Sequence, residues 1–174
     1  MAQLRRCITR LCPFKAPGED GIPNTIIKES MEVIAEYLLE IYWATFSLNT
    51  YSDRWRVWDT IVLQKPRYDV SKAHRPIALM NTLRKLLSAL VAEDLTHMCD
   101  YYSLLPNNHF GGRPGRCTTD AMHLLAHKIK AAWRRHNMAA VLFLDVEGAF
   151  PNAVTAQLLH NMRMCRVPEE YSCL

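Results

Sequence analysis

Apolar residues recur every three to four positions in several stretches of the chain, and this period predicts amphipathic helices. In the first stretch, Ile27, Met31 and Ile34 share one helical face. The stretches with this pattern are 24 to about 47, just after 81 to about 98, 118 or 119 to about 136, and roughly 154 to 164. Turn-forming residues at Ala16–Pro23 and a glycine-rich loop at Leu105–Cys117 lie outside them. A helix-rich chain is therefore expected.

Shorter apolar runs predict strands. Thr60–Gln64 is expected to form one, and 65–79, with a polar middle and a proline towards each end, is expected to form a two-stranded ribbon with a basic, exposed tip. Five apolar residues at Ala140–Leu144 run into Asp145 and predict a buried strand that carries a carboxylate to a sheet edge. By position, Asp145 is equally well explained as a helix cap or a turn residue. Helices followed by a strand between helices predict an α+β fold.

The composition describes an ordinary globular chain, one domain or part of one, with 174 residues of which 49% are hydrophobic and 22% charged. Its net charge of +4 permits an anionic partner without requiring one. The six cysteines include no Cys-x-x-Cys pair, which is typical of reduced thiols.

No apolar run is long enough for a bilayer span or a signal-peptide core. We therefore expect an intracellular protein, nuclear or cytoplasmic, that is neither secreted nor membrane-bound. The Arg-rich N-terminus also fits an organellar transit segment, although Thr9 is the single hydroxyl residue within it.

Four segments, taken in order, resemble the reverse transcriptases of non-LTR retrotransposons. They are KAPGEDGIPN from Lys15, the run from Lys65-Pro66 to HRPIAL, HFGGRPGRCTTDA from His109, and LDVEGAF from Leu144. No single segment is decisive, because turn-rich and basic stretches are common. Their order and spacing over nearly the whole chain make the resemblance specific. It implies a partial right-hand polymerase fold, with helix-rich fingers, a basic β-hairpin and connecting palm helices in 1–136. The start of the palm, with its first metal-ligand strand and a helix, would occupy 137–174.

The resemblance also implies RNA-directed DNA polymerisation, with an RNA template, a DNA primer and dNTPs as partners and Mg²⁺ as cofactor. In such a reaction two cations held by carboxylates stabilise the attacking and leaving oxygens. Carried over by position, Asp145 is a catalytic metal ligand, and the backbone carbonyl of Val146 contacts the second metal. Phe150 stacks under the sugar and excludes a ribose 2′-hydroxyl, although core packing would explain this ring without the resemblance. Glu147 is expected to be solvated, because Gly148 suggests that the strand breaks there.

Basic residues are predicted to contact the anionic substrates. The resemblance puts Lys65 and Arg75 on a fingers hairpin over the triphosphate, where a lysine point charge and an arginine fork suit phosphates. Arg113 and Arg116 lie in a loop whose backbone amides can approach phosphates, so we predict contact with template or nucleotide, Arg113 contributing more. A solvated polar loop is the alternative for the segment that carries Lys65 and Arg75.

The helix expected at 118–136 carries two further candidates. His123 and His127 lie one turn apart, a spacing that can hold zinc. However, Leu124 stands where an HExxH motif has glutamate, so ordinary helix residues are the simpler interpretation. Arg134 and Arg135 are expected on a solvated face, with contact to a nucleic-acid backbone as the alternative.

The second acidic motif of a polymerase has no counterpart in this sequence, which contains no Asp-Asp dipeptide. The chain also has Pro151-Asn152 where the family commonly has Asp after the aromatic, which should alter the following turn rather than the metal site. One carboxylate does not hold two hard cations. We therefore expect a truncated copy or fragment that does not polymerise DNA by itself and, with its apolar strand unpaired, is poorly soluble. No membrane contact or obligate protein partner is predicted.

Two alternatives belong to other functional classes. A non-catalytic nucleic-acid-binding module derived from a retroelement would keep the basic fingers. An aspartyl-nucleophile phosphatase would use Asp145 as nucleophile and Glu147 as acid. The phosphatase motif is a weak match, because it lacks its usual hydroxyl residue and lies near the wrong end of the chain.

Overall fold

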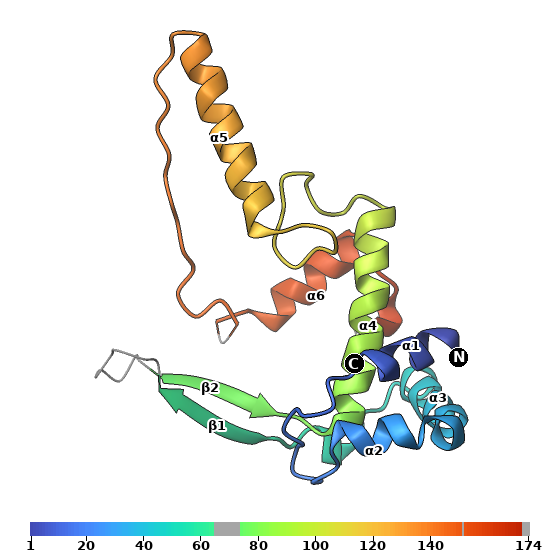
Figure 1. Ribbon diagram of the computed structural model, residues 1–174. Coiled ribbons are helices and arrows are strands. Elements are labelled where there is room, and N and C mark those ends of the chain that lie inside the picture. Colours follow the sequence, from blue (N-terminus) through green and yellow to red (C-terminus); the bar gives the residue numbers. More distant parts are fainter. Residues whose placement is uncertain (65–73, 151, 172–174) are drawn as a thin grey trace. The chain divides into compact units, whose positions relative to one another are not determined.

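The computed structural model describes residues 1–64, 74–150 and 152–171 (Figure 1). Packing divides the chain into unit 1, which is Met1–Asp94 with the segment from Pro168, and unit 2, which is Leu95–Val167. The elements are α1 (Ala2–Arg10), α2 (Asn24–Glu29), α3 (Met31–Ser47), η1 (Asp53–Trp55), β1 (Asp59–Gln64), β2 (His74–Leu79), α4 (Thr82–Tyr101), α5 (Thr118–Arg134), α6 (Thr155–Met164) and η3 (Glu169–Tyr171). The α+β class is confirmed as a helix-rich chain with one β-hairpin. None of the described helices combines the length and apolarity needed to cross a membrane.

The helices of unit 1 pack around one apolar cluster. Leu4 and Ile8 of α1 are 1% and 0% exposed, and Leu86 of α4 is 0% exposed. Tyr42 of α3 packs its ring 6.0 Å from that of Trp55 and donates its hydroxyl to the carbonyl oxygen of Leu83 at 2.8 Å. Each fully buried apolar side chain contributes about 1.5–3 kcal/mol. The other buried members are Cys7, Ile27, Leu38 and Leu87.

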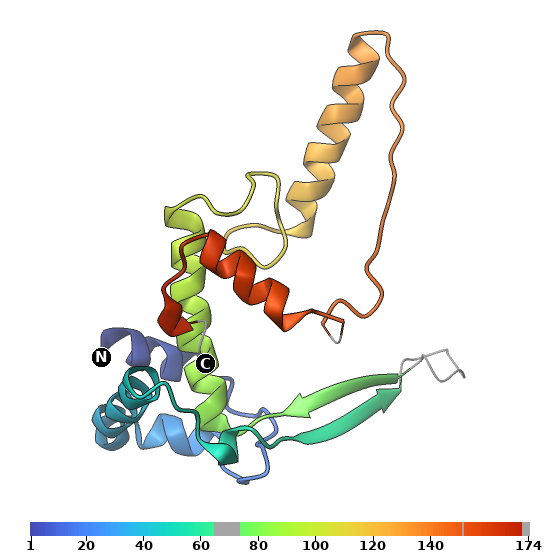
Figure 2. The ribbon, with the colours of Figure 1, turned by 180° about the vertical axis from the view of Figure 1, so that it is seen from behind.

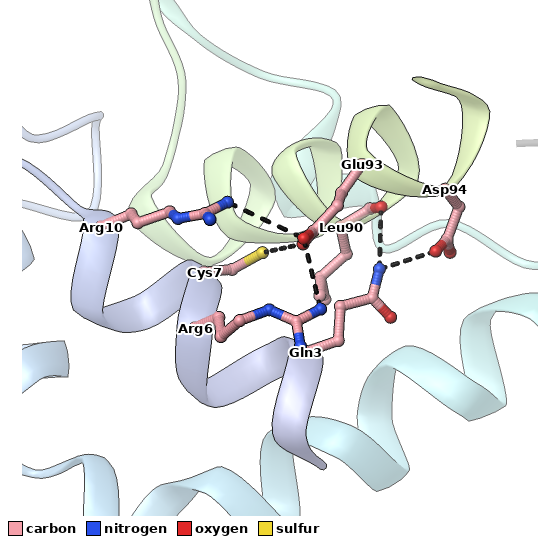
Figure 3. A network of polar contacts seen from close by, with 7 residues as sticks. All are labelled: Gln3, Arg6, Cys7, Arg10, Leu90, Glu93 and Asp94. Atoms are coloured by element: carbon pink, nitrogen blue, oxygen red, sulfur yellow. Dashed lines mark hydrogen bonds and ion pairs between the residues drawn. The ribbon is translucent and has the colours of Figure 1, made fainter. Parts of the chain in front are cut away.

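The N-terminal helix α1 is not among the elements expected from the sequence. Its apolar residues Leu4, Cys7 and Ile8 have helical spacing, and all three are buried. Two basic residues of this helix, Arg6 and Arg10, face Glu93 of α4 (Figure 3), whereas Arg5 pairs with Glu32 of α3 at 2.6 Å. The carboxylate of Glu93 accepts from Arg6 at 3.3 Å and from the Cys7 thiol at 3.3 Å, and Arg10 lies 3.7 Å away. The basic N-terminus is therefore part of the packed unit.

The single helix expected from Asn24 is wrong in one respect, because the structure has two helices that meet at Ser30. The backbone of Ser30 has φ −90° and ψ 4°, outside helical geometry. Its hydroxyl donates to the carbonyl oxygen of Ile26 at 2.6 Å. A serine that bonds back to the preceding turn competes with the regular helical ladder, which explains the break.

The expected strand at Thr60–Gln64 is confirmed as β1, and its partner is β2. The ribbon predicted within 65–79 is only partly right, because its first strand lies upstream at Asp59–Gln64, while 65–73 lie outside the described residues. The antiparallel register pairs Ile61 with Ile77 and Leu63 with Arg75. Directly paired residues point to the same face of a hairpin, so Arg75 shares a face with these apolar side chains.

The three later helices follow their predicted ranges closely. α5 begins at Thr118 and is capped by Cys117: the carboxylate of Asp120 accepts from the Cys117 backbone amide at 2.8 Å, which forms a capping box. This bond and the Cys117 thiol lower the pKa of Asp120.

The strand predicted at Ala140–Leu144 is wrong, because this segment has no regular secondary structure. From α5 the chain returns in an extended path towards α6 (Figure 2). Leu142, Phe143 and Leu144 are 80%, 78% and 85% exposed. A strand forms only when a neighbour supplies hydrogen bonds, and no described strand pairs with this segment.

Candidate functional site

Asp145 lies at the end of this extended segment, in unit 2. One oxygen of its carboxylate accepts a hydrogen bond from the backbone amide of Val146 at 3.0 Å. Val146 is 70% exposed and Phe150 is 95% exposed, so Phe150 is not a core residue among the described part of the chain. Glu147 is exposed, as expected. The carboxylate and the ring therefore lie on one accessible stretch.

A tight turn follows Asp145. Gly148 has φ +62°, a conformation that favours glycine. The side-chain amide of Asn152 donates to the carbonyl oxygen of Glu147 at 3.0 Å, and its backbone amide donates to Gly148 at 2.9 Å. The asparagine at the unusual Pro151-Asn152 pair thus closes the turn.

The residues that surround Asp145 do not make a complete metal site. Within residues 1–64, 74–150 and 152–171, no group of three or more His, Cys, Asp or Glu side chains could hold a metal ion. Mg²⁺ binds one or two carboxylates, but two cations need more than one such ligand. This set therefore does not fit the pair of Mg²⁺ ions used by the resembled polymerases. The same finding leaves His123 and His127 without a third described ligand.

Of the two residues predicted to contact the triphosphate, the structure describes only Arg75. Lys65 lies outside the described residues, and Arg75 lies on β2, exposed, opposite Leu63. Arg75 belongs to unit 1 and Asp145 to unit 2. The role of each in holding a nucleotide stays a prediction.

Arg113 and Arg116 both hold their own loop in shape. The guanidinium of Arg113 donates to the Asp100 carboxylate at 2.7 Å and to the carbonyl oxygen of Pro106 at 3.2 Å, and its side chain is 13% exposed. Arg116 donates to the carbonyl oxygen of Asn107 at 2.6 Å and lies 5.6 Å from the Phe110 ring centroid. Nucleic-acid contact by these residues stays a prediction, and these bonds give Arg113 a structural role as well.

The turn-rich segment 16–23 is bound to the start of α4. The Thr82 hydroxyl donates to the carbonyl oxygen of Ile22 at 2.6 Å, and the Lys85 ammonium donates to that of Ala16 at 2.8 Å. Burial lowers the pKa of Lys85. Gly18 lies so close to α4 that an added Cβ would be 2.5 Å from the backbone nitrogen of Asn81. The sequence did not predict that segment 16–23 packs against the start of α4, because no local pattern links residues about 60 positions apart.

Comparison with known proteins defines the class. The family described as "Reverse transcriptase (RNA-dependent DNA polymerase)" matches residues 63–174, more than half of the chain. The chain therefore belongs to the reverse transcriptase family.

Curated relatives from Drosophila melanogaster point to non-LTR retrotransposons. The chain is 26% identical over 150 residues to the probable RNA-directed DNA polymerase from transposon X-element, covering 85% of this chain and 16% of the relative. It is 24% identical over 174 residues to the RNA-directed DNA polymerase from mobile element jockey, covering 98% and 19%. A putative 115 kDa protein in the type-1 retrotransposable element R1DM is 29% identical over 153 residues, covering 84% and 14%. The chain thus spans less than one-fifth of the length of these relatives.

Proposed function

We propose that this chain is part of an RNA-directed DNA polymerase of a non-LTR retrotransposon and contributes the first metal-ligand aspartate of its nucleotidyl-transfer site. The observation that supports this is Asp145, which follows an apolar run inside the residues that match the family. In the proposed division, 1–136 are fingers and connecting palm helices and 137–174 begin the palm.

The proposed residue roles follow the chemistry of each side chain. Asp145 and the carbonyl of Val146 would hold metal, and Phe150 would test the sugar. Lys65 and Arg75 would hold the triphosphate, because a lysine point charge and an arginine fork suit its oxygens. Template RNA, a DNA primer and dNTPs would be the partners.

We further propose that this polypeptide does not polymerise DNA by itself. Among the described residues, no group of three or more His, Cys, Asp or Glu side chains gathers at Asp145, so the ligands that two hard cations need are not assembled there. Primer extension with the purified 174-residue chain, an RNA template, a DNA primer, dNTPs and Mg²⁺ or Mn²⁺ tests this, with the Asp145→Asn variant as control. No extension above that control is expected. Robust synthesis that the variant abolishes would contradict the proposal.

A non-catalytic nucleic-acid-binding module is the second candidate, and the charge of unit 2 favours it. Unit 2 holds eight Lys and Arg against four Asp and Glu, a net charge of +4. If binding is the whole function, Asp145→Ala leaves RNA affinity unchanged and Arg75→Ala weakens it, with an affinity that falls as salt rises. If Asp145→Ala weakens RNA binding as much as Arg75→Ala does, Asp145 contributes to RNA binding, which contradicts a function based on the basic residues alone.

A further inference from the structure

Helix α5 lies in a segment with an unusual charge pattern. Between Asp120 and Asp145 the sequence contains no acidic residue. The same interval contains four permanently basic residues, Lys128, Lys130, Arg134 and Arg135. The one acidic residue of α5, Asp120, lies in its first turn, so the later part of the helix has a net positive charge.

Four residues of α5 form one line along the helix, which we name the basic stripe: His123, His127, Lys130 and Arg134. Their spacings of four, three and four residues put them on one face, because an α-helix turns once every 3.6 residues. At a rise of 1.5 Å per residue the basic stripe is about 16 Å long. All four residues are exposed.

The apolar residues of α5 occupy a different side of the helix. Met122, Leu125, Ile129 and Trp133 follow the same spacing but are offset from the basic stripe by roughly 100°. Met122 and Trp133 are 62% and 63% exposed, and no residue of α5 is buried. A partner that covers the apolar side would therefore leave the basic stripe open.

The two cations of the basic stripe, Lys130 and Arg134, do not stabilise the fold through side-chain bonds in the part of the chain that the structure describes. Within the described residues, neither Lys130 nor Arg134 has an ion-pair partner or a side-chain hydrogen bond. By contrast, Arg6 and Arg113 are paired with Glu93 and Asp100. A free cation gives its full charge to an incoming anion and breaks no existing bond.

We propose that the basic stripe binds the sugar-phosphate backbone of a nucleic-acid strand. This inference rests on the proposed function, because membership of a polymerase family favours a nucleic acid over other polyanions. A row of donors about 16 Å long can follow several phosphates, because the cations of Lys130 and Arg134 attract them and imidazole N–H groups donate hydrogen bonds to phosphate oxygens. A basic amphipathic helix is also typical of anionic membrane surfaces, which the experiment distinguishes.

The test compares two double variants of the full chain that remove the same charge. Lys130→Gln with Arg134→Gln removes both permanent cations of the basic stripe, and glutamine keeps helix propensity. Lys15→Gln with Arg54→Gln removes two exposed cations from unit 1 as the matched control. Circular dichroism checks that both variants keep the helix content of the parent chain.

Binding to a 20-nucleotide oligo(U) RNA is measured between 50 mM and 500 mM salt by fluorescence anisotropy. Each phosphate contact contributes about −0.7 to the slope of log K against log salt for single strands. Loss of two contacts should therefore flatten the slope by about 1.4 and weaken binding about 25-fold at 0.1 M salt, if affinities converge at 1 M. The control pair should change the slope by less than about 0.3, since it touches no phosphate in this proposal.

The outcomes separate the two proposals. If log K falls with log salt at the same slope in both double variants and RNA still binds, the basic stripe does not bind RNA. The proposed function is then unaffected. Failure of the parent chain to bind RNA at 50 mM salt overturns the basic stripe and the nucleic-acid part of the proposed function together. If vesicles containing phosphatidylserine lose binding in the stripe variant while RNA does not, the surface is a lipid site and the proposal is wrong.

Discussion

Replacement of Gly18 by alanine tests most directly whether segment 16–23 packs against the start of α4. A Cβ at this position would lie 2.5 Å from the backbone nitrogen of Asn81 and 2.6 Å from the carbonyl carbon of Met80. Ordinary contacts between such atoms are about 3.5–4.0 Å, so the overlap is close to 1 Å. Both atoms belong to the backbone, which cannot rotate away as a flexible side chain could. Either α4 or the segment must shift.

The expected cost can be worked out from these contacts. Overpacking a filled site typically costs 1–3 kcal/mol, and the size of this overlap puts Gly18→Ala at about 3 kcal/mol. A shift would also lengthen the hydrogen bond from Thr82 to Ile22, now 2.6 Å, and losing it adds about 1 kcal/mol. We therefore expect a loss of about 3–4 kcal/mol in the free energy of unfolding.

Two other glycines serve as matched controls in urea denaturation followed by circular dichroism. Gly21 has φ +64° but open space around its Cβ position, so Gly21→Ala should cost about 1–2 kcal/mol from backbone strain. The Cβ position of Gly111 has open space around it and its φ is not positive, so Gly111→Ala should stay within about 0.5 kcal/mol of the parent chain. If Gly18→Ala unfolds at the same urea concentration as Gly111→Ala, segment 16–23 does not lie against α4 as described.

Two further predictions concern buried groups of unit 1. Burial, followed by the hydrogen bond and charge of Glu93, raises the pKa of the Cys7 thiol from 9.0 to about 11. In native protein at pH 8, iodoacetamide should therefore label the exposed Cys12 well before Cys7, as read by mass spectrometry; equal labelling rates would count against this environment. Because the folded state holds the Cys7 proton more tightly, the contribution of this group to stability is complete below pH 9 and should decline as pH rises through about 11. Tyr42→Phe leaves the carbonyl oxygen of Leu83 without its partner and should lower the free energy of unfolding by about 1 kcal/mol, whereas a change below about 0.3 kcal/mol would mean that the bond contributes nothing.

Periodicity predicts the helices of this chain because a helix closes its hydrogen bonds within one segment. α4, α5 and α6 all lie within a few residues of their predicted ranges for this reason. α1 is too short to show more than two apolar turns, so the helical spacing of Leu4, Cys7 and Ile8 is a weak signal among its charged residues.

Strands and binding sites depend on residues distant in the sequence, which a local pattern does not identify. The apolar run at Ala140–Leu144 has the composition of a strand, yet it remains irregular where no described strand pairs with it. In the same way, the glycine-rich loop predicted Arg113 as a phosphate contact, but only the structure shows that Asp100 takes up its charge. A sequence shows which side chains are suited to a ligand, and packing decides which of them are left free.

This difference changes what the net charge of +4 means. The arginines of the N-terminus are clustered in the sequence, but Arg6 and Arg10 lie close to Glu93, and unit 1 as a whole has as many acidic as basic residues. The whole excess belongs to unit 2, where Lys130 and Arg134 have no acidic partner among the described residues. Binding of a polyanion through free cations does not require Asp145, whereas nucleotidyl transfer does. Under the two proposals we therefore expect Asp145→Asn to leave binding through the basic stripe unchanged, although it would remove the proposed metal ligand.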